Sequence, residues 1–244
     1  MRVGFILAAG KQSRFDSHIP KALSMYNGSS ILDMNIDIMK LYCDDIYVVC
    51  SDTNKKYFNK YKTIITKKNS GCGDTVAKAL DYYINKYKPS SNVECIIQWG
   101  DSIQTYDVYE SLDFGDKSDF MIQVPCYEEK SPYVNLKLNE CFNNHIEKVL
   151  FSKFGEVNNS EYGWHDCSLF YGNIYYIYNA CVRFLNYFRE KDGYKDIGHG
   201  NEFNFLDIFN ETMARGFGRP INKGKCFPKS FNTVDELYYI GGNI

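Results

Sequence analysis

The chain has 244 residues, of which 44% are hydrophobic and 16% aromatic, and its 28 basic and 30 acidic side chains give a formal net charge of -2. This apolar content with almost balanced charge excludes an intrinsically disordered chain. The lack of a basic excess argues against nucleic acid as a partner. No uninterrupted apolar stretch approaches the roughly 18 residues of a membrane span, so we expect no membrane partner.

Nine cysteines are scattered along the chain without a Cys-x-x-Cys pair or zinc-finger spacing. Their odd number argues against a disulfide framework, and reduced thiols are typical of a cytoplasmic protein. The apolar run at 3–9 is followed at once by the polar residues 10–14. We therefore interpret it as a buried first strand rather than a targeting signal.

The first half of the sequence alternates strand and helix patterns. Ser30 is placed to cap a helix with Asp33 in its first turn, Asp52 or Thr53 opens a polar helix, and Asp74 or Thr75 caps a third helix. This alternation predicts an open, doubly wound parallel sheet. Its strands are expected over 3–7, 46–50, 63–66 and 93–99, where short apolar runs end in turn residues.

The second half lacks long helices between its first strand patterns. This predicts an antiparallel insertion that then returns to the sheet, so the expected fold class is α/β, a Rossmann-like mostly parallel sheet flanked by helices with an antiparallel β insertion. Strands are predicted over 120–124, 133–138, 145–150, 169–178, 217–221 and 226–229, and helices over 179–190, 203–215 and 233–240.

The segment after the first strand has the composition of a phosphate-binding loop. Small residues there let backbone N–H groups approach a phosphate chain. Arg14 and Lys21 would place positive charge on the same anion. The alternative is an ordinary strand-to-helix turn with solvated charges. The segment comprises Leu7, Ala8, Ala9, Gly10, Lys11, Gln12, Ser13 and Arg14, with Pro20 and Lys21 following.

This string resembles the signature L-A-A-G-x-G-[ST]-R…P-K of nucleotidyltransferases that join a nucleoside triphosphate to a phosphorylated sugar or alcohol, among them sugar-phosphate nucleotidylyltransferases and small cytidylyltransferases. The departure is Gln12, where the family has a second glycine. The resemblance implies a single GT-A-like domain over 1–244, with a nucleotide-binding half at 1–115 and an acceptor-binding half at 116–244. It implies nucleotide binding by residues 7–13 and a catalytic role for Arg14 and Lys21.

The same resemblance implies a Mg²⁺ cofactor. Asp101 follows an apolar strand directly, where α/β folds bind their ligands, and the family carries a metal-binding Gly-Asp at this point. Asn232 falls on the family position that completes the metal site, with Asp235 as the second candidate. The simpler interpretations are that Asp101 caps a turn and that Asn232 or Thr233 caps the last helix.

A glycine-containing turn at 70–75 resembles the family segment that lies along the base and ribose. Gly71 and Gly73 would allow close approach, and Asp74, followed by Thr75, could accept a hydrogen bond from the amine of cytosine. The alternative is that Asp74 caps a helix. Together with the short chain this favours CTP, with UTP, dTTP and GTP left open.

Further segments resemble the acceptor-binding parts of the family, each with a structural alternative such as a strand-edge ion pair or helix-start charge. Trp164 and His165 lie in a polar loop that could cover the site. The acceptor-binding candidates are Glu147, Lys148, Gly172, Asn173, Glu202 and Lys229.

The expected activity is Mg²⁺-dependent transfer of a nucleoside monophosphate, CMP from CTP, to a phosphorylated sugar or polyol, as a precursor of a surface polysaccharide. Two alternatives stay open. A non-catalytic nucleotide-sugar sensor would fit Gln12 and Asn232. A glycosyltransferase is disfavoured because no Asp-x-Asp pair is present. The surplus of Tyr and Phe is compatible with a homo-oligomer.

Overall fold

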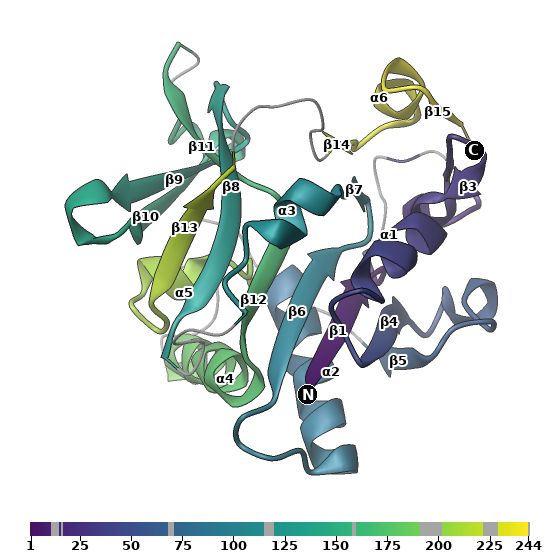
Figure 1. The fold of residues 1–244 in the computed structure, drawn as a ribbon, viewed down its shortest axis with the longest axis horizontal. Helices are drawn as coiled ribbons and strands as arrows, with labels where there is room; N and C mark the ends of the chain where they lie inside the picture. Colours follow the sequence, from purple (N-terminus) through teal and green to yellow (C-terminus); the bar gives the residue numbers. More distant parts are fainter. Residues whose placement is uncertain are drawn as a thin grey trace.

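The computed structural model describes residues 1–10, 15, 17–67, 71–114, 120–157, 160–190, 202–221 and 229–243. A ten-stranded mixed sheet runs through these residues, with helices on both faces (Figure 1). In spatial order the strands are β11 (Tyr162–Asp166), β9 (Val134–Asn139), β10 (His145–Phe151), β13 (Gly216–Pro220), β8 (Ile122–Lys130), β12 (Leu169–Asn173), β6 (Glu94–Trp99), β1 (Arg2–Leu7), β4 (Asp45–Ser51) and β5 (Thr63–Thr66).

The half of the sheet formed by β6, β1, β4 and β5 is parallel, as the sequence predicts. Alternate residues of β1 face opposite sides, so Phe5 packs in one apolar cluster and Ile6 in the other. The helices that cover the two faces are α1 (Ile31–Met39) and α3 (Tyr106–Glu110) on the Ile6 side, and α2 (Cys72–Tyr87), α4 (Ile174–Glu190) and α5 (Asp207–Asn210) on the Phe5 side.

Helix α1 begins as expected, because the Ser30 side chain accepts a hydrogen bond from the Asp33 N–H. The polar helix expected from Asp52 or Thr53 is wrong. The chain there forms one 3-10 turn, Lys55–Tyr57, with no side-chain cap. The predicted capping of the next helix by Asp74 or Thr75 is also wrong, because α2 starts earlier, after Gly71.

The predicted strand over 169–178 is half strand and half helix. The Asn173 Oδ1 accepts hydrogen bonds from the N–H groups of Tyr175 (2.9 Å) and Tyr176 (3.1 Å). This cap turns the chain into α4 straight after β12, and the aromatic residues that favour a strand lie on the helix instead. The helix predicted over 203–215 shrinks to α5, because the Phe203 carbonyl and the Phe205 N–H are bonded to the start of α2.

Two small sheets and a last helix complete the described chain. The predicted last helix is present as α6 (Val234–Tyr239). Sequence patterns missed strand β11 and all of the two-residue strands except part of β14. The short strands are β2 (Met25–Tyr26), β3 (Ser29–Ser30) and β15 (Gly242–Asn243) in one sheet, and β7 (Ser102–Ile103) with β14 (Lys229–Ser230) in the other. No helix in the described ranges has the length and apolarity to cross a membrane.

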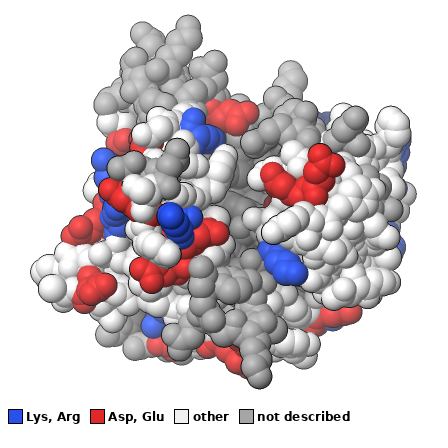
Figure 2. Space-filling view, turned by 90° about the horizontal axis from the view of Figure 1, so that it is seen from above, with Lys and Arg blue, Asp and Glu red and all other residues white. Residues whose placement is uncertain are grey.

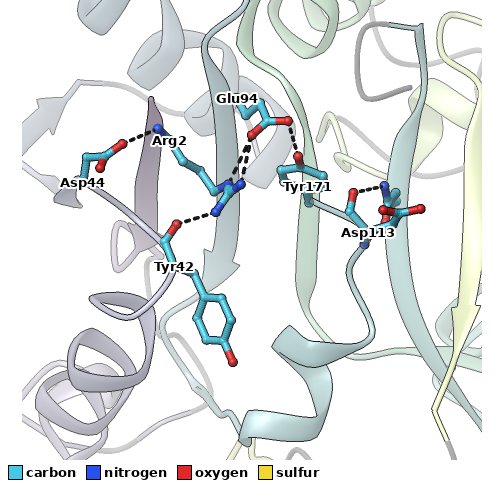
Figure 3. A network of polar contacts seen from close by, with 7 residues as sticks. Arg2, Tyr42, Asp44, Glu94, Asp113 and Tyr171 are labelled. Atoms are coloured by element: carbon cyan, nitrogen blue, oxygen red, sulfur yellow. Dashed lines mark hydrogen bonds and ion pairs between the residues drawn. The ribbon is translucent and has the colours of Figure 1, made fainter. Parts of the chain in front are cut away.

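A polar network closes the edge of the sheet where β1 and β6 begin (Figure 3). The Arg2 guanidinium forms an ion pair with Glu94 (3.1 Å), donates to the Tyr42 carbonyl (2.8 Å) and lies 4.0 Å over the Phe114 ring. The Tyr171 hydroxyl donates to the other Glu94 oxygen. This edge is therefore occupied by the protein's own side chains, whereas Lys21 and Asp101 meet at the opposite edge.

Candidate functional site

The carboxyl ends of β1 and β6 touch through a glycine. The Gly100 N–H donates to the Leu7 carbonyl at 2.9 Å. A Cβ atom at Gly100 would lie 2.8 Å from that carbonyl oxygen and 3.4 Å from the Ala22 Cβ. Only glycine allows this approach, and it places Asp101 beside the end of β1, where open α/β sheets bind ligands.

Lys21 faces Asp101 at this edge. Its Nζ lies 3.8 Å from the Asp101 Oδ2 and donates to the Phe231 carbonyl at 3.4 Å. The Lys21 side chain is only 11% exposed, and its Nζ lies over the rings of Phe15 and Phe231, 5.6 and 6.0 Å from their centres. A positive charge is thus held in a fixed place beside the loop that follows β1.

The Asp101 carboxylate is perturbed by its surroundings. The Asp101 side chain is 40% exposed, but the protein packed around it displaces enough water to raise the pKa of its carboxyl, and the Lys21 ammonium opposes this shift. Keeping the Asp101 carboxylate ionised therefore costs free energy, and a bound cation would reduce that cost.

The C-terminal segment reaches the same place through a short antiparallel pair. Ser230 of β14 pairs with Ser102 of β7, the residue directly after Asp101. Asn232 follows two residues later, and its N–H donates to the Glu236 carboxylate at 2.5 Å. The cap of α6 is the Thr233 hydroxyl.

The residues at this edge fit a hard cation that also binds a phosphate chain. Among the described residues no group of three or more His, Cys, Asp and Glu side chains could enclose a metal by itself. Mg²⁺ is typically held by one or two carboxylates plus substrate phosphates rather than by an all-protein cage. Asp101 supplies one carboxylate of that kind, and the pairing of Ser230 with Ser102 brings the segment of Asn232 to the same edge.

Asn35 is a positioning residue that sequence patterns missed. Its Nδ2 donates to the Ser102 carbonyl (2.8 Å), and its Oδ1 accepts from the Gln104 N–H (3.2 Å). The side chain is fully buried on α1. It therefore fixes the chain just after Asp101, and a polar residue on the apolar face of a helix was the available signal.

The glycines at the start of α2 serve a different contact from the one expected. The Gly73 N–H donates to the Phe203 carbonyl at 3.0 Å, and a Cβ at Gly73 would lie 2.7 Å from the Phe203 ring. A Cβ at Gly71 would collide with the same carbonyl. The close approach is thus to the protein's own chain, and it brings Glu202 next to the start of α2.

Asp74 lies in the first turn of α2 rather than at its cap. Its Oδ2 is 2.7 Å from the Lys78 Nζ. The Thr75 hydroxyl donates to the Gly71 carbonyl at 3.0 Å. A nucleotide base that forms a hydrogen bond with the Asp74 carboxylate would therefore share that carboxylate with the Lys78 ammonium.

The remaining candidates are spread over the molecule. Gly172 and Asn173 pair with the first residues of β6, at the edge opposite Asp101, where Asn173 caps α4. Glu147 and Lys148 are exposed on β10, and Glu147 accepts from Asn139 at 2.5 Å. The Lys229 Nζ donates to the Tyr26 hydroxyl at 2.9 Å, which anchors the C-terminal segment.

The loop after β1 is described only at its start. Leu7 ends β1, the Ala8 N–H donates to the Val49 carbonyl at 2.7 Å, Ala9 is half-buried and Gly10 is exposed. In the view onto this edge, acidic and basic side chains lie on both sides of a central hollow (Figure 2). The predicted residues Lys11, Gln12, Ser13 and Arg14 lie outside the described residues.

Comparison with known proteins shows which proteins the chain resembles. Residues 4–91 match the model of the MobA-like NTP transferase domain. A 67-residue stretch is 37% identical to the 2-C-methyl-D-erythritol 4-phosphate cytidylyltransferase of Thermosipho africanus (strain TCF52B). That stretch is 28% of this chain and 29% of the relative, so the match spans less than a third of either protein.

Solved structures match over almost the whole chain. The inositol-1-phosphate CTP transferase from T. maritima has a TM-score of 0.65 and 15% identity, and covers 97% of this chain and 91% of its own. The CTP:phosphocholine cytidylyltransferase LicC from Streptococcus pneumoniae has a TM-score of 0.68 and 12% identity, with 98% of each chain covered. HddC from Yersinia pseudotuberculosis, complexed with GMP-PN, has a TM-score of 0.63 and 16% identity over 98% of this chain and 97% of its own.

The fold is therefore that of the nucleotidyltransferases, which confirms the expected α/β architecture. The match of residues 4–91 to the MobA-like NTP transferase domain agrees with the resemblance drawn from the sequence motif in this part of the chain.

Proposed function

We propose that this protein transfers CMP from CTP to the phosphate group of a phosphorylated sugar or polyol and releases pyrophosphate. The observation that carries the proposal is the largely buried Lys21 ammonium, held 3.8 Å from Asp101 where β1 and β6 end. A fixed positive charge facing a carboxylate at this edge suits the triphosphate of a nucleotide and its cation. The named activities of the relatives support the same class of reaction.

The reaction needs charge stabilisation more than proton transfer. An oxygen of the acceptor phosphate attacks the α-phosphorus of CTP, a new phosphoanhydride bond forms, and the bond from the α-phosphorus to the bridging oxygen of the β-phosphate breaks. Pyrophosphate leaves with that electron pair. The acceptor phosphate is already anionic at neutral pH, so no protein base is required, and catalysis consists of positioning and electrostatic stabilisation.

Lys21 would offset the charge that develops on the α-phosphate and on the leaving pyrophosphate. Asp101 and Asn232 would hold Mg²⁺, which supplies neutralisation of the phosphate charges when bound. The Asn35 amide would keep the segment after Asp101 in place when the carboxylate binds the metal ion.

The preference for CTP rests on similarity. Two of the matched structures and the matched sequence are named as CTP or cytidylyl enzymes. One matched structure holds a guanine nucleotide analogue, so the fold itself accommodates more than one base. An activated sugar or polyol of this kind would be a precursor of a surface polysaccharide.

The test is pyrophosphate release with Mg²⁺, in which CTP, UTP, dTTP, ATP and GTP are each combined with a panel of sugar and polyol phosphates. The proposal predicts release with CTP that depends on the acceptor and is lost in Asp101→Ala. Binding of a triphosphate without release under every combination would instead favour a nucleotide sensor. Release with a different triphosphate would correct the base and keep the reaction class.

A further inference from the structure

A second polar cluster lies on the antiparallel strands next to this site. The Nδ1 atom of His165 on β11 is 2.7 Å from the Glu129 Oε2 and 3.1 Å from the Tyr127 hydroxyl, both on β8. None of these three side chains takes part in the proposed transfer of CMP. Charged and polar groups gathered on a sheet face beside a reaction site are candidates for substrate recognition.

The strand register places a fourth polar side chain on the same face. Tyr127 lies opposite His165 and Glu129 opposite Gly163 in the β8–β11 pair. Alternate residues of a strand point to opposite faces, so Tyr127, Glu129, Gly163 and His165 share one face of the sheet. Asn135 supplies the fourth polar side chain of this face. The amide of Asn135 on β9 lies directly over Gly163, where the Cβ of any other residue would overlap it.

Asn135 is a buried group without a visible partner. It is 1% exposed, and neither its Nδ2 nor its Oδ1 has a hydrogen-bond partner among the described residues. Buried amides in folded proteins are almost always hydrogen bonded. An unpaired amide beside Glu129 and His165 is therefore an independent sign that this face receives a polar ligand.

A backbone contact and a shared apolar cluster connect the strands of this face with the proposed reaction site. The Tyr127 ring packs in the same apolar cluster as Ala8 and Ala22, the residues that flank the β1 loop and Lys21. The Ser168 carbonyl accepts from the Trp99 N–H at 3.0 Å, two residues before Asp101. His165 is three residues from Ser168, a chain distance of at most about 10 Å.

We propose that Tyr127, Glu129, Asn135 and His165 form a hydroxyl-recognition surface that selects an acceptor phosphate whose organic group is uncharged and rich in hydroxyl groups. The proposal rests on the proposed function. A carboxylate, an imidazole, a phenol and an amide together offer both hydrogen-bond donors and hydrogen-bond acceptors. This combination suits hydroxyl groups, because every hydroxyl group can both donate and accept a hydrogen bond. Recognition of a quaternary ammonium instead needs open aromatic faces, and the Tyr127 ring is buried.

The first test compares two neighbouring glutamates. Glu129→Gln changes the surface, whereas Glu128→Gln changes an exposed residue that points to the opposite face. With CTP as donor, the KM for glucose 1-phosphate or glycerol 3-phosphate, whichever is turned over, should rise at least tenfold in Glu129→Gln. It should change less than twofold in Glu128→Gln, and the KM for CTP should stay unchanged in both. Equal effects of the two substitutions would overturn the proposal.

A binding measurement separates this inference from the proposed function. Isothermal titration calorimetry with glucose 1-phosphate, glycerol 3-phosphate and phosphocholine needs no turnover. Binding of glucose 1-phosphate or glycerol 3-phosphate that is lost in Glu129→Gln supports the surface even if no triphosphate reacts. Failure of both of these phosphates to bind, or tighter binding of phosphocholine, would overturn the proposal.

Asn135→Leu gives a second readout that a structural role would not produce. Replacing an unpaired buried amide with an apolar side chain of similar size should leave the melting temperature unchanged or raise it. If the amide binds the acceptor, the same variant loses at least tenfold in affinity for the polyol phosphate. A higher melting temperature with unchanged affinity would overturn the assignment of Asn135.

Discussion

Replacing Lys21 with Met separates catalysis from stability. Met is unbranched like Lys and fills similar space, but it removes the ammonium group together with its contacts to the rings of Phe15 and Phe231. Loss of a single fixed charge aimed at developing negative charge typically reduces kcat by about 10²–10³. We expect a fall of that size in the pyrophosphate release of Lys21→Met.

The cost in stability should be much smaller. The Lys21 side chain is 11% exposed but its partner Asp101 is 40% exposed, at 3.8 Å. This places the pair between exposed ion pairs, worth up to about 1 kcal/mol, and buried ones, whose disruption costs about 3–5 kcal/mol. A loss of about 1–2 kcal/mol lowers the melting temperature of a chain of this size by roughly 2–8 °C.

The matched control is Lys62→Met. Lys62 pairs with Asp45 at 2.5 Å on the surface, and its side chain is 66% exposed. We expect that variant to keep kcat within twofold and the melting temperature within about 2 °C. A Lys21→Met variant that keeps more than a tenth of the wild-type kcat, or that melts more than about 10 °C below the wild type, would contradict the proposed role of Lys21.

Three further predictions follow from the contacts at the same edge. Burial raises the pKa of Asp101, so its ionised carboxylate costs stability as pH rises above about 4. The melting temperature of Asp101→Asn, relative to that of the wild type, should therefore be higher at pH 7 than at pH 4, while turnover falls at least a hundredfold. A variant that compares less favourably with the wild type at pH 7 than at pH 4 contradicts this. Gly100→Ala should cost about 1–3 kcal/mol in urea denaturation and reduce turnover, because its Cβ would press on the Leu7 carbonyl; an unaffected variant argues against the close contact. Asn35→Ala should lower the free energy of unfolding by about 2–3 kcal/mol in the same assay, because the Ser102 carbonyl and the Gln104 N–H lose their buried partner. The kcat should fall as well, and a normal kcat would show that Asn35 does not position Asp101.

Local patterns predicted the parallel half of the sheet well. The strand at 63–66 and the cap of α1 at Ser30 agree with the structure because short apolar runs and caps are determined by neighbouring residues. The strand predicted over 169–178 failed because the Asn173 cap outweighed the strand preference of the following tyrosines. Local propensity is overridden where a specific hydrogen bond competes with it.

The candidate site was predictable only in part. Gly100 and Asp101 follow a predicted strand, so their place at the sheet edge was foreseeable. The pairing of β7 with β14, which brings Asn232 near Asp101, joins segments more than a hundred residues apart and has no local signal. The glycines 71 and 73 indicated a close approach, but the partner, Phe203, lies in a segment that sequence spacing cannot place beside them.

The most direct test of the proposed reaction site is a crystal structure with CTP and Mn²⁺ in place of Mg²⁺, with the metal located by its anomalous scattering. The proposed function predicts one strong peak bonded to the Asp101 carboxylate, with the triphosphate against Lys21 and the loop after β1. A metal and nucleotide bound elsewhere, with Asp101 still paired to Lys21 alone, would contradict it.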